Sequence, residues 1–428
     1  MYILVILGLS FLLKLGLLIH VSANDPTQLL ANDSASYTDS ARALLQTGSF
    51  AVSPELSEVP QTVRTPGYPL LIAGAYALFG ERNGPVVFIQ ILLSIGILAI
   101  VYRVARKQWN QGVALLAALI LALDQISLAF TLKILTETLF TLLLFGVLVA
   151  IAPVSSSSRV PGRILLAGAL LALATMVRPI SYYMIPPMIV ALLFYGRHRQ
   201  WPAKRSAGLS LLLLLPFVLL VGGWQVRNYH RTGSAEFSTI QGRNLLLYRG
   251  AGIVAIRDGI GFQEARAKLE ELHPDEATWT DEGMDLVASH PLIFLRTQAV
   301  GAVKMLLGTG HPELLELCGI HLGEQGAIGD LLRLAPRDYV RKWIAGAPVA
   351  FGAFVILFLY VILVWCGVVL WLWKDVIRCR RLGWWDVCMW GTVVYFVAVS
   401  AGPEAYPRFR VPIMPVLAMY AARGIRSV

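Results

Sequence analysis

The sequence predicts an all-α integral membrane protein, a polytopic bundle of about ten transmembrane helices. Two observations support this fold class. Of the 428 residues, 57% are hydrophobic and 14% are charged, and the mean hydropathy is +0.65. Soluble globular domains carry about 25% charged residues, so this balance is typical of a membrane protein. The apolar residues also gather in runs that are long enough to cross a bilayer.

These runs are distributed along most of the chain. They cover residues 2–21, 84–104, 112–130, 135–153, 161–178, 180–196, 207–224, 348–373, 385–401 and 408–422. About ten spans place both chain ends on the same side of the membrane. We expect this side to be cytoplasmic, because the basic clusters of the short connections then all face the cytoplasm, as the positive-inside rule requires.

The first apolar run has two interpretations. Val21-Ser22-Ala23 has the small residues of a signal-peptide cleavage site. However, no positive charge precedes the run, and Lys14 interrupts it. Because signal peptides usually carry a basic segment before the apolar stretch, we favour a first helix that stays in the protein.

The spans divide the chain into three predicted parts. Residues 1–224 form a transmembrane module that includes a first outer loop at 22–83, which carries the polar, acid-bearing residues 32–39. Residues 225–347 form a long extracytoplasmic loop with short helices, and residues 348–428 supply the C-terminal transmembrane helices. Within this second loop we expect helices at Gln263–Leu272 and Glu282–Ser289, and a more apolar one at Pro291–Leu307 that lies on or dips into the membrane.

The first outer loop contains two predicted helices. Ser34–Thr47 reads as an amphipathic helix that begins with Asp33 or Ser34 as N-cap and ends before Gly48. The run 66–80 is too short to span and is bounded by Pro and Gly, so we expect it to lie at the outer interface.

Composition excludes several classes of function. The net charge of +10 comes from basic clusters beside the spans, which argues against a nucleic-acid partner. Neither the four cysteines nor the seven histidines show metal-ligand spacing, and the cysteines offer no disulfide framework. No nucleotide-binding or serine-hydrolase motif occurs.

Asp33 is the first candidate for chemistry. As an N-cap it stabilises a helix by about 1 kcal/mol, and the helix terminus also favours the ionised carboxylate that a general base requires. Tyr37, four residues later, shares its helical face. Asp39 does not, and it lies three residues before Arg42, which predicts a surface ion pair.

Glu137 is the second candidate, at the outer end of an apolar run. It is either a solvated residue that complements the helix dipole, a partner of Lys133 four residues earlier, or a second functional acid. The sequence leaves these alternatives open.

Arginines at the outer ends of spans form a third group. Arg178, Arg227, Arg408 and Arg410 all fall on the side where basic residues are depleted. Each could be a snorkelling anchor. Because guanidinium is the preferred partner of a phosphate, several arginines at one face with acids nearby also suit an anionic lipid head group.

Together these segments resemble the GT-C superfamily of polytopic glycosyltransferases. The similarity is to the family 39-like branch that is related to protein O-mannosyltransferases and to the lipid A aminoarabinose transferase. It rests on short motifs in the same order: Asp33 with Tyr37, Arg64-Thr65-Pro66-Gly67-Tyr68-Pro69, Thr136-Glu137, Arg178-Pro179, Trp224 to Tyr229, and Arg408 and Arg410 with Pro412 and Pro415.

The resemblance implies a sugar donor carried on a polyprenyl phosphate and transfer outside the plasma (inner) membrane. Asp33 matches the family's catalytic acid and would deprotonate the acceptor hydroxyl. Arg408, Arg410 and Arg178 would stabilise the departing phosphate. Four further residues are expected to line the site: Tyr37, Arg64, Tyr68 and Arg227.

Two departures from the family limit this inference. Asp33 is followed by Ser34, where relatives often carry a second acid, and we expect the soluble C-terminal domain of some relatives to be missing. The resemblance therefore fixes neither a divalent metal nor the acceptor, which is a lipid, a glycan or a protein. A flippase for lipid-linked sugars and a non-catalytic cell-envelope assembly protein are the competing hypotheses, and the latter would predict that Asp33 is dispensable.

Overall fold

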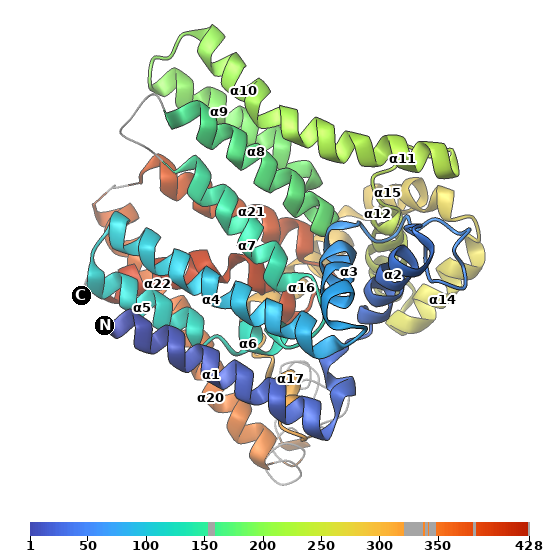
Figure 1. The fold of residues 1–428 in the computed structure, drawn as a ribbon, viewed down its shortest axis with the longest axis horizontal. Coiled ribbons are helices and arrows are strands. Elements are labelled where there is room, and N and C mark those ends of the chain that lie inside the picture. Colours follow the sequence, from blue (N-terminus) through green and yellow to red (C-terminus); the bar gives the residue numbers. More distant parts are fainter. Residues whose placement is uncertain (153–158, 321–336, 339–340, 342–347, 380–381, 427–428) are drawn as a thin grey trace.

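The computed structural model describes the chain except for residues 153–158, 321–336, 339–340, 342–347, 380–381 and 427–428. The described residues form helices, joined by loops that contain one isolated β-bridge between Ala51 and Pro60 (Figure 1). The all-α prediction is therefore confirmed.

Six helical stretches of the described chain are long and apolar enough to cross a membrane. They are α1 (Tyr2–Asn24), α4 (Asn83–Gln108), α8 (Val160–Val177), η3 with α9 (Pro179–Met184 and Ile185–His198), α10 through η4 to α11 (Ala203–Phe217, Val218–Gly222 and Gly223–Thr232), and α20 with η8 (Pro348–Trp371 and Leu372–Arg378).

Two bent helix pairs raise this number to at most eight. The first joins α5 (Gln111–Ala122) to α6 (Gln125–Thr131) at 56°, and the second joins η6 and α15 (Glu276–Thr278 and Trp279–Ser289) to α16 (Pro291–Leu307) at 100°. The chain is thus a multi-pass membrane protein, but the count of about ten spans is not confirmed. Three apolar helices are shorter: α3 (Gly67–Phe79), α7 (Glu137–Ile151) and α21 (Trp384–Ser400).

The bundle has two distinct ends in Figure 1. The end that carries both chain termini, which we call the terminal end, also holds the turn between α9 and α10. At the opposite end, which we call the loop end, lie α3 and α2 (Ser34–Thr47). Neighbouring helices pack in the pairs α1 with α4, α4 with α5, α7 with α8, and α8 with α10.

The first segment of the loop end follows the predicted pattern. After α1, the short η1 (Pro26–Leu29) leads to α2, which ends at Gly48 in the left-handed conformation (φ 70°) that favours glycine. Helix α3 lies within the predicted run 66–80. The predicted ion pair between Asp39 and Arg42 is also confirmed, with a separation of 2.7 Å.

The chain between α11 and α16 contains a small helical unit with its own apolar core. It is built from α12 (Ile240–Asn244), η5 (Leu245–Gly250), α13 (Ala251–Asp258), α14 (Phe262–Leu272) and α15. Leu246, Leu247 and Trp279 are buried in this core. The predicted helices at Gln263–Leu272, Glu282–Ser289 and Pro291–Leu307 are confirmed by α14, α15 and α16, and α17 (His311–Leu317) follows.

The last apolar run does not begin as an α-helix at residue 408. Its first part is the 3₁₀ helix η9 (Pro407–Ile413), and α22 (Met414–Arg426) follows. Pro412 lies inside η9, and because proline lacks a backbone N–H it cannot donate to a helical hydrogen bond there. This local geometry sets the direction in which Arg408 and Arg410 project.

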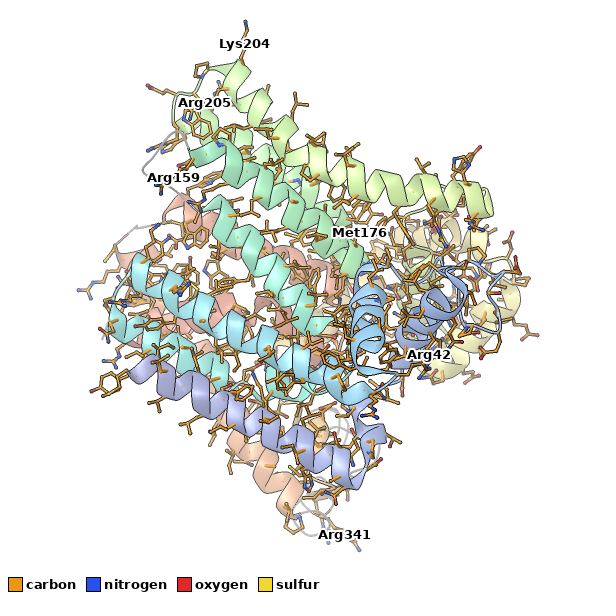
Figure 2. All side chains as sticks on the ribbon, viewed as in Figure 1. Arg42, Arg159, Met176, Lys204, Arg205 and Arg341 are labelled. Carbon is orange, nitrogen blue, oxygen red and sulfur yellow. The ribbon has the colours of Figure 1, made fainter. Side chains whose placement is uncertain are left out.

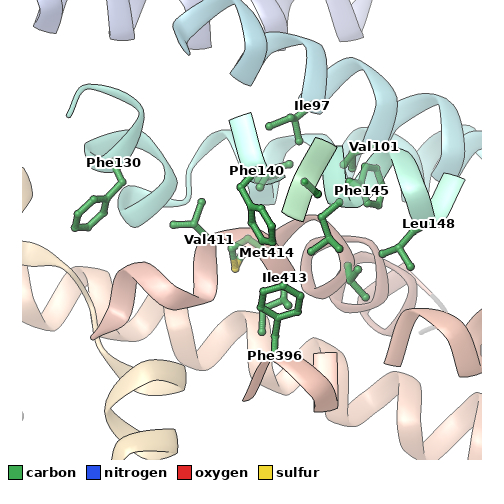
Figure 3. Packing of buried hydrophobic residues seen from close by; sticks show 14 of the residues in the cluster. Ile97, Val101, Phe130, Phe140, Phe145, Leu148, Phe396, Val411, Ile413 and Met414 are labelled. Carbon is green, nitrogen blue, oxygen red and sulfur yellow. The ribbon is translucent and has the colours of Figure 1, made fainter. Parts of the chain in front are cut away.

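The main core joins α7 to the C-terminal helices. The rings of Phe140 and Phe396 lie 5.7 Å apart, and Val411 and Ile413 of η9 are buried beside them (Figure 3). This packing fixes the start of α7 against η9, and so places Glu137 close to Arg408.

A close helix contact yields a first prediction. A Cβ at Gly424 in α22 would collide with the Gly367 carbonyl oxygen of α20 and would lie 2.6 Å from the Trp371 nitrogen. We expect Gly424→Ala to lower the free energy of unfolding by about 1–3 kcal/mol through overpacking. Thermal unfolding in detergent measures the effect. Gly352→Ala on α20 is the control, because a Cβ there meets nothing within 4 Å. Equal melting temperatures for the two variants would contradict the prediction.

Candidate functional site

The Asp33 side chain lies between two arginines. Its Oδ1 accepts a hydrogen bond of 2.8 Å from Arg64 Nη2, and its Oδ2 accepts one of 2.7 Å from Arg408 Nη2. Asp33 occupies the N-cap position of α2 but makes no capping hydrogen bond with its side chain. The carboxylate therefore joins α2, the loop before α3, and η9, rather than only starting a helix.

Ser34 holds this segment in place. Its side chain is buried, accepts a hydrogen bond of 2.8 Å from the Ala31 N–H, and donates one of 2.8 Å to the Ile134 carbonyl. The start of α2 is thereby tied to the chain just before Glu137. Ser34, at the position where relatives often have a second acid, thus makes a structural contact. The local sequence gave no sign of this contact.

Glu137 completes the cluster. It begins α7, its side chain is 2% exposed, and its Oε1 accepts a hydrogen bond of 2.9 Å from Arg178. Arg408 Nε lies 3.8 Å from the same oxygen. Glu137 Oε2 is buried and has no hydrogen-bond partner among the described residues. Lys133, the alternative partner, instead forms an ion pair of 3.0 Å with Glu316.

These side chains form a continuous arginine–carboxylate cluster: Arg64, Asp33, Arg408, Glu137 and Arg178. Three guanidinium groups face two carboxyl groups, so the formal charges leave one positive charge in excess. The Asp33 side chain is 33% exposed, whereas Glu137 is almost fully buried. The cluster is therefore accessible to a ligand at Asp33 and closed at Glu137, and its excess charge suits an anion.

Two tyrosines support Arg64. Arg64 donates a hydrogen bond of 3.2 Å to the Tyr37 hydroxyl, and its guanidinium carbon lies 4.7 Å from the centre of the Tyr37 ring. The Tyr68 ring packs edge-on against Tyr37 at 5.3 Å, and the Tyr68 hydroxyl donates to Gln90 Oε1 at 2.7 Å. Tyr37 therefore touches the cluster directly, while fully buried Tyr68 supports it from beneath.

The arginines change the acidity of Asp33. Burial tends to raise the pKa of its carboxyl, but the charges of Arg408 and Arg64 and their hydrogen bonds outweigh this and lower the pKa from 3.8 to about 2. Burial likewise tends to lower the pKa of Arg408, and the charges of Glu137 and Asp33 raise it instead. Asp33 is therefore ionised at neutral pH, and the arginines stay protonated.

Arg410 and Arg227 have other contacts. Arg410 is 2% exposed, donates hydrogen bonds to the Leu306 and Gly308 carbonyls at 2.6 and 3.1 Å, and lies 3.7 Å from Asp124. These contacts join η9 to the end of α16, so the structure places Arg410 apart from the cluster.

Arg227 lies over the Trp224 ring, 4.7 Å from its centre. It donates hydrogen bonds to the Phe50 and Gln61 carbonyls at 2.7 and 3.1 Å. Its guanidinium thus holds the loop between α2 and α3 against α11, and it also lies outside the cluster.

Sequence reasoning missed Phe409 as part of the site. The guanidinium carbons of Arg178 and Arg408 lie 5.7 and 5.4 Å from the centre of its ring. An aromatic face attracts cations, so this ring helps to hold two arginines that repel each other. Its position between Arg408 and Arg410 in the sequence was the one available signal.

The cluster does not have the composition of a metal site. No group of three or more His, Cys, Asp or Glu that could hold a metal occurs among the described residues. Both oxygens of Asp33 and Oε1 of Glu137 accept from arginines. Because these cationic donors already occupy the oxygens, the residues do not fit a divalent ion.

Comparison with known proteins agrees with the sequence resemblance. Residues 63–224 match the family model described as dolichyl-phosphate-mannose-protein mannosyltransferase, and this range contains Arg64, Glu137 and Arg178. The fold is similar to the oligosaccharyltransferase of Archaeoglobus fulgidus, with a TM-score of 0.52 and 15% identity over 99% of this chain and 49% of that chain. The resemblance to GT-C glycosyltransferases is thus confirmed. No curated protein sequence matches the chain.

Two further solved structures are also similar to this chain. The archaeal oligosaccharyltransferase AglB from the same organism, in complex with an inhibitory peptide and a dolichol-phosphate, has a TM-score of 0.50 and 14% identity over 100% of this chain and 50% of that chain. ArnT from Cupriavidus metallidurans bound to undecaprenyl phosphate has a TM-score of 0.42 and 14% identity over 99% and 76%. The chain spans about half the length of the oligosaccharyltransferase that it matches.

Proposed function

We propose that the protein is a membrane glycosyltransferase that moves a sugar from a polyprenyl-phosphate donor to a hydroxyl of an extracytoplasmic acceptor. The observation that carries this proposal is the bridging of Asp33 by Arg64 and Arg408 at 2.8 and 2.7 Å. A carboxylate that is partly exposed, next to arginines in positive excess, offers both a base and a phosphate partner. The oligosaccharyltransferase AglB, which has a similar fold, is found in complex with a dolichol-phosphate. This supports a lipid phosphate as the donor's carrier.

The proposed reaction is a displacement at the anomeric carbon. The acceptor oxygen forms a bond to this carbon while the bond from the carbon to the phosphate oxygen breaks. Asp33 takes the hydroxyl proton as general base, and the polyprenyl phosphate leaves with the electron pair. Arg408 and Arg178 stabilise the charge that develops on the leaving phosphate. No separate general acid is required, because a phosphate is already a good leaving group.

Donor binding must also change the acidity of Asp33. With a pKa of about 2, the carboxylate is a weak base while both arginines contact it. A donor phosphate next to Arg408 competes with Asp33 for the same guanidinium. The exchange places Arg408 on the phosphate and removes a hydrogen bond and a positive charge from Asp33. The pKa of Asp33 then rises, so the base becomes stronger when the donor is present.

This exchange predicts different pH profiles for the two kinetic parameters. In the free enzyme the pKa of Asp33 lies below its ordinary value, so the carboxylate stays charged. The kcat/KM for the donor, which reports on the free enzyme, therefore shows no acid limb from Asp33 above about pH 4. In the donor complex the pKa is higher, so the acid limb of kcat lies at higher pH than that of kcat/KM. Initial rates with a non-titrating acceptor measure both profiles. Coincident acid limbs would argue against the exchange.

We also propose the membrane topology that the sequence suggested. Ten spans result if the α5–α6 pair and the shorter helices α7, α21 and α22 are counted as spans in addition to the six long stretches. The cluster then faces the extracytoplasmic side of the plasma membrane, and both termini lie in the cytoplasm. The division into 1–224, 225–347 and 348–428 follows the same topology. Protease accessibility of tags at both termini, in sealed vesicles whose extracytoplasmic face points outward, tests this topology. Tags that the external protease can cleave would overturn it.

In the decisive experiment, the purified protein is placed in lipid and supplied with synthetic polyprenyl-phosphate sugars and candidate hydroxyl acceptors. Lipids, glycans and protein segments are compared as acceptors. Appearance of the glycosylated acceptor, together with free polyprenyl phosphate, is the expected result. Movement of the donor across the bilayer without transfer would favour the flippase hypothesis instead.

A further inference from the structure

A cavity lies at the terminal end of the bundle, away from the arginine–carboxylate cluster. It has a volume of about 340 Å³, is lined by residues of α7, α8, α9, α10 and α21, and no cluster residue occurs among the lining residues that the structure describes. Most of its wall is apolar, as with Leu148, Ile164, Met188, Leu192 and Leu213. Its volume falls in the range of about 300–1,000 Å³ that is typical of small-molecule sites.

The charged side chains that the structure describes in the cavity wall are arginines. Arg163, Arg199 and Arg205 line it, and no Asp or Glu does among the described residues. Figure 2 shows Arg159, Lys204 and Arg205 gathered at the same end of the bundle, far from Arg42. Moreover, no acidic residue occurs in the sequence from residue 138 to residue 235. The cavity therefore combines an apolar interior with a cationic edge.

The three arginines differ in their contacts. Arg163 donates to the Ala150 and Val149 carbonyls at 3.0 and 2.5 Å, so it closes the C-terminal end of α7. Arg205 lies over the Trp201 ring, with its guanidinium carbon 4.6 Å from the ring centre. Arg199 is exposed, 6.0 Å from the Tyr195 ring. Arg163 thus holds a helix end, whereas Arg199 and Arg205 lie beside aromatic rings that also line the cavity.

We propose that this cavity binds an acyl chain of an anionic glycerophospholipid, with its phosphate against Arg199 and Arg205. The apolar interior excludes a free sugar or nucleotide, since their hydroxyl groups would lack partners there. Because arginines and no acids occur among the lining residues that the structure describes, the cavity favours a negative head group over a zwitterionic one. Trp201 and Trp384 line the same edge and are the residue type that is enriched at the head-group level of a bilayer. The site is separate from the proposed catalytic one and does not depend on it.

Native mass spectrometry of the purified protein, incubated with phosphatidylglycerol, phosphatidylcholine or undecaprenyl phosphate, tests the proposal. We expect phosphatidylglycerol to be retained in preference to the other two. Arg199→Gln with Arg205→Gln should weaken its retention by roughly fivefold for each arginine removed. The matched control is Arg197→Gln with Lys204→Gln, which removes the same charge from exposed side chains that do not line the cavity.

A second pair of variants tests the apolar interior. Gly391 lines the cavity, and a Cβ there meets nothing within 4 Å, so Gly391→Leu should place extra side-chain volume in the cavity and reduce lipid retention. Gly208→Leu is the control, because Gly208 has equally open space but does not line the cavity. Preferred retention of undecaprenyl phosphate would make this a site for the polyprenyl carrier and overturn the proposal. Equal retention of phosphatidylcholine, or unchanged retention in both the arginine and the Gly391 variants, would also overturn it.

Discussion

Replacement of Asp33 by Asn is expected to lower kcat for sugar transfer by about 10²–10⁴-fold, the contribution of a positioned general base. Asn keeps the shape of the side chain, and its amide oxygen still accepts from one of the two arginines. It cannot take the proton of the acceptor hydroxyl. Because Asp33 is one-third exposed and lies at the end of a helix, the variant should fold. The loss should therefore appear in the chemical step.

The measurement is the single-turnover rate of transfer with bound polyprenyl-phosphate sugar, alongside the melting temperature of the variant. Asp39→Asn is the matched control, because it removes a carboxylate from α2, and the partner of this carboxylate is Arg42 at the surface. A folded Asp33→Asn protein that transfers sugar at the normal rate would show that Asp33 is not the base. If neither the natural protein nor the Asp33→Asn variant transfers sugar, yet both support normal cell-envelope function, the assembly hypothesis is favoured instead.

The sequence predicted the local features of this site well. The bounds of α2 match the predicted ones, with Asp33 at the N-cap position and Gly48 at the end, although the Asp33 side chain makes no capping hydrogen bond. Helix α16 follows from an apolar run between Pro291 and a glycine. Such signals depend on neighbouring residues alone. Asp33, Glu137, Arg178 and Arg408 were candidates for the same reason, because charged residues beside apolar runs stand out.

The partners of these residues could not be predicted from spacing. Lys133 is four residues from Glu137 in the sequence, yet the tertiary fold brings Arg178 and Arg408 to the glutamate and Glu316 to the lysine. The buried hydroxyl of Ser34 and the ring of Phe409 also act through contacts with distant segments. The number of spans was equally hard to fix, since α7 and α21 are shorter than a bilayer-spanning helix usually is.

Arg408 and Arg410 are expected to respond in opposite ways to the same substitution. Arg408→Gln should lower kcat by about 10²–10³-fold, the cost of losing one preorganised donor to a developing negative charge. The variant should stay folded, because Arg64 still pairs with Asp33 and Arg178 still pairs with Glu137. Arg410→Gln removes the arginine beside fully buried Asp124 and two hydrogen bonds to carbonyls of residues 306 and 308.

Leaving a buried charge without its partner typically costs about 3–5 kcal/mol, so Arg410→Gln should mainly lower the melting temperature. The fraction that remains folded should transfer sugar at the normal rate, because Arg410 does not touch the cluster. Thermal unfolding and transfer rates per folded molecule, measured on both variants, separate these effects. The reverse outcome, a stable but inactive Arg410→Gln protein and an active Arg408→Gln protein, would move the phosphate-binding role from Arg408 to Arg410. The 3₁₀ geometry of η9 is the physical reason to expect otherwise, since it turns Arg408 toward Asp33 and Arg410 toward the end of α16.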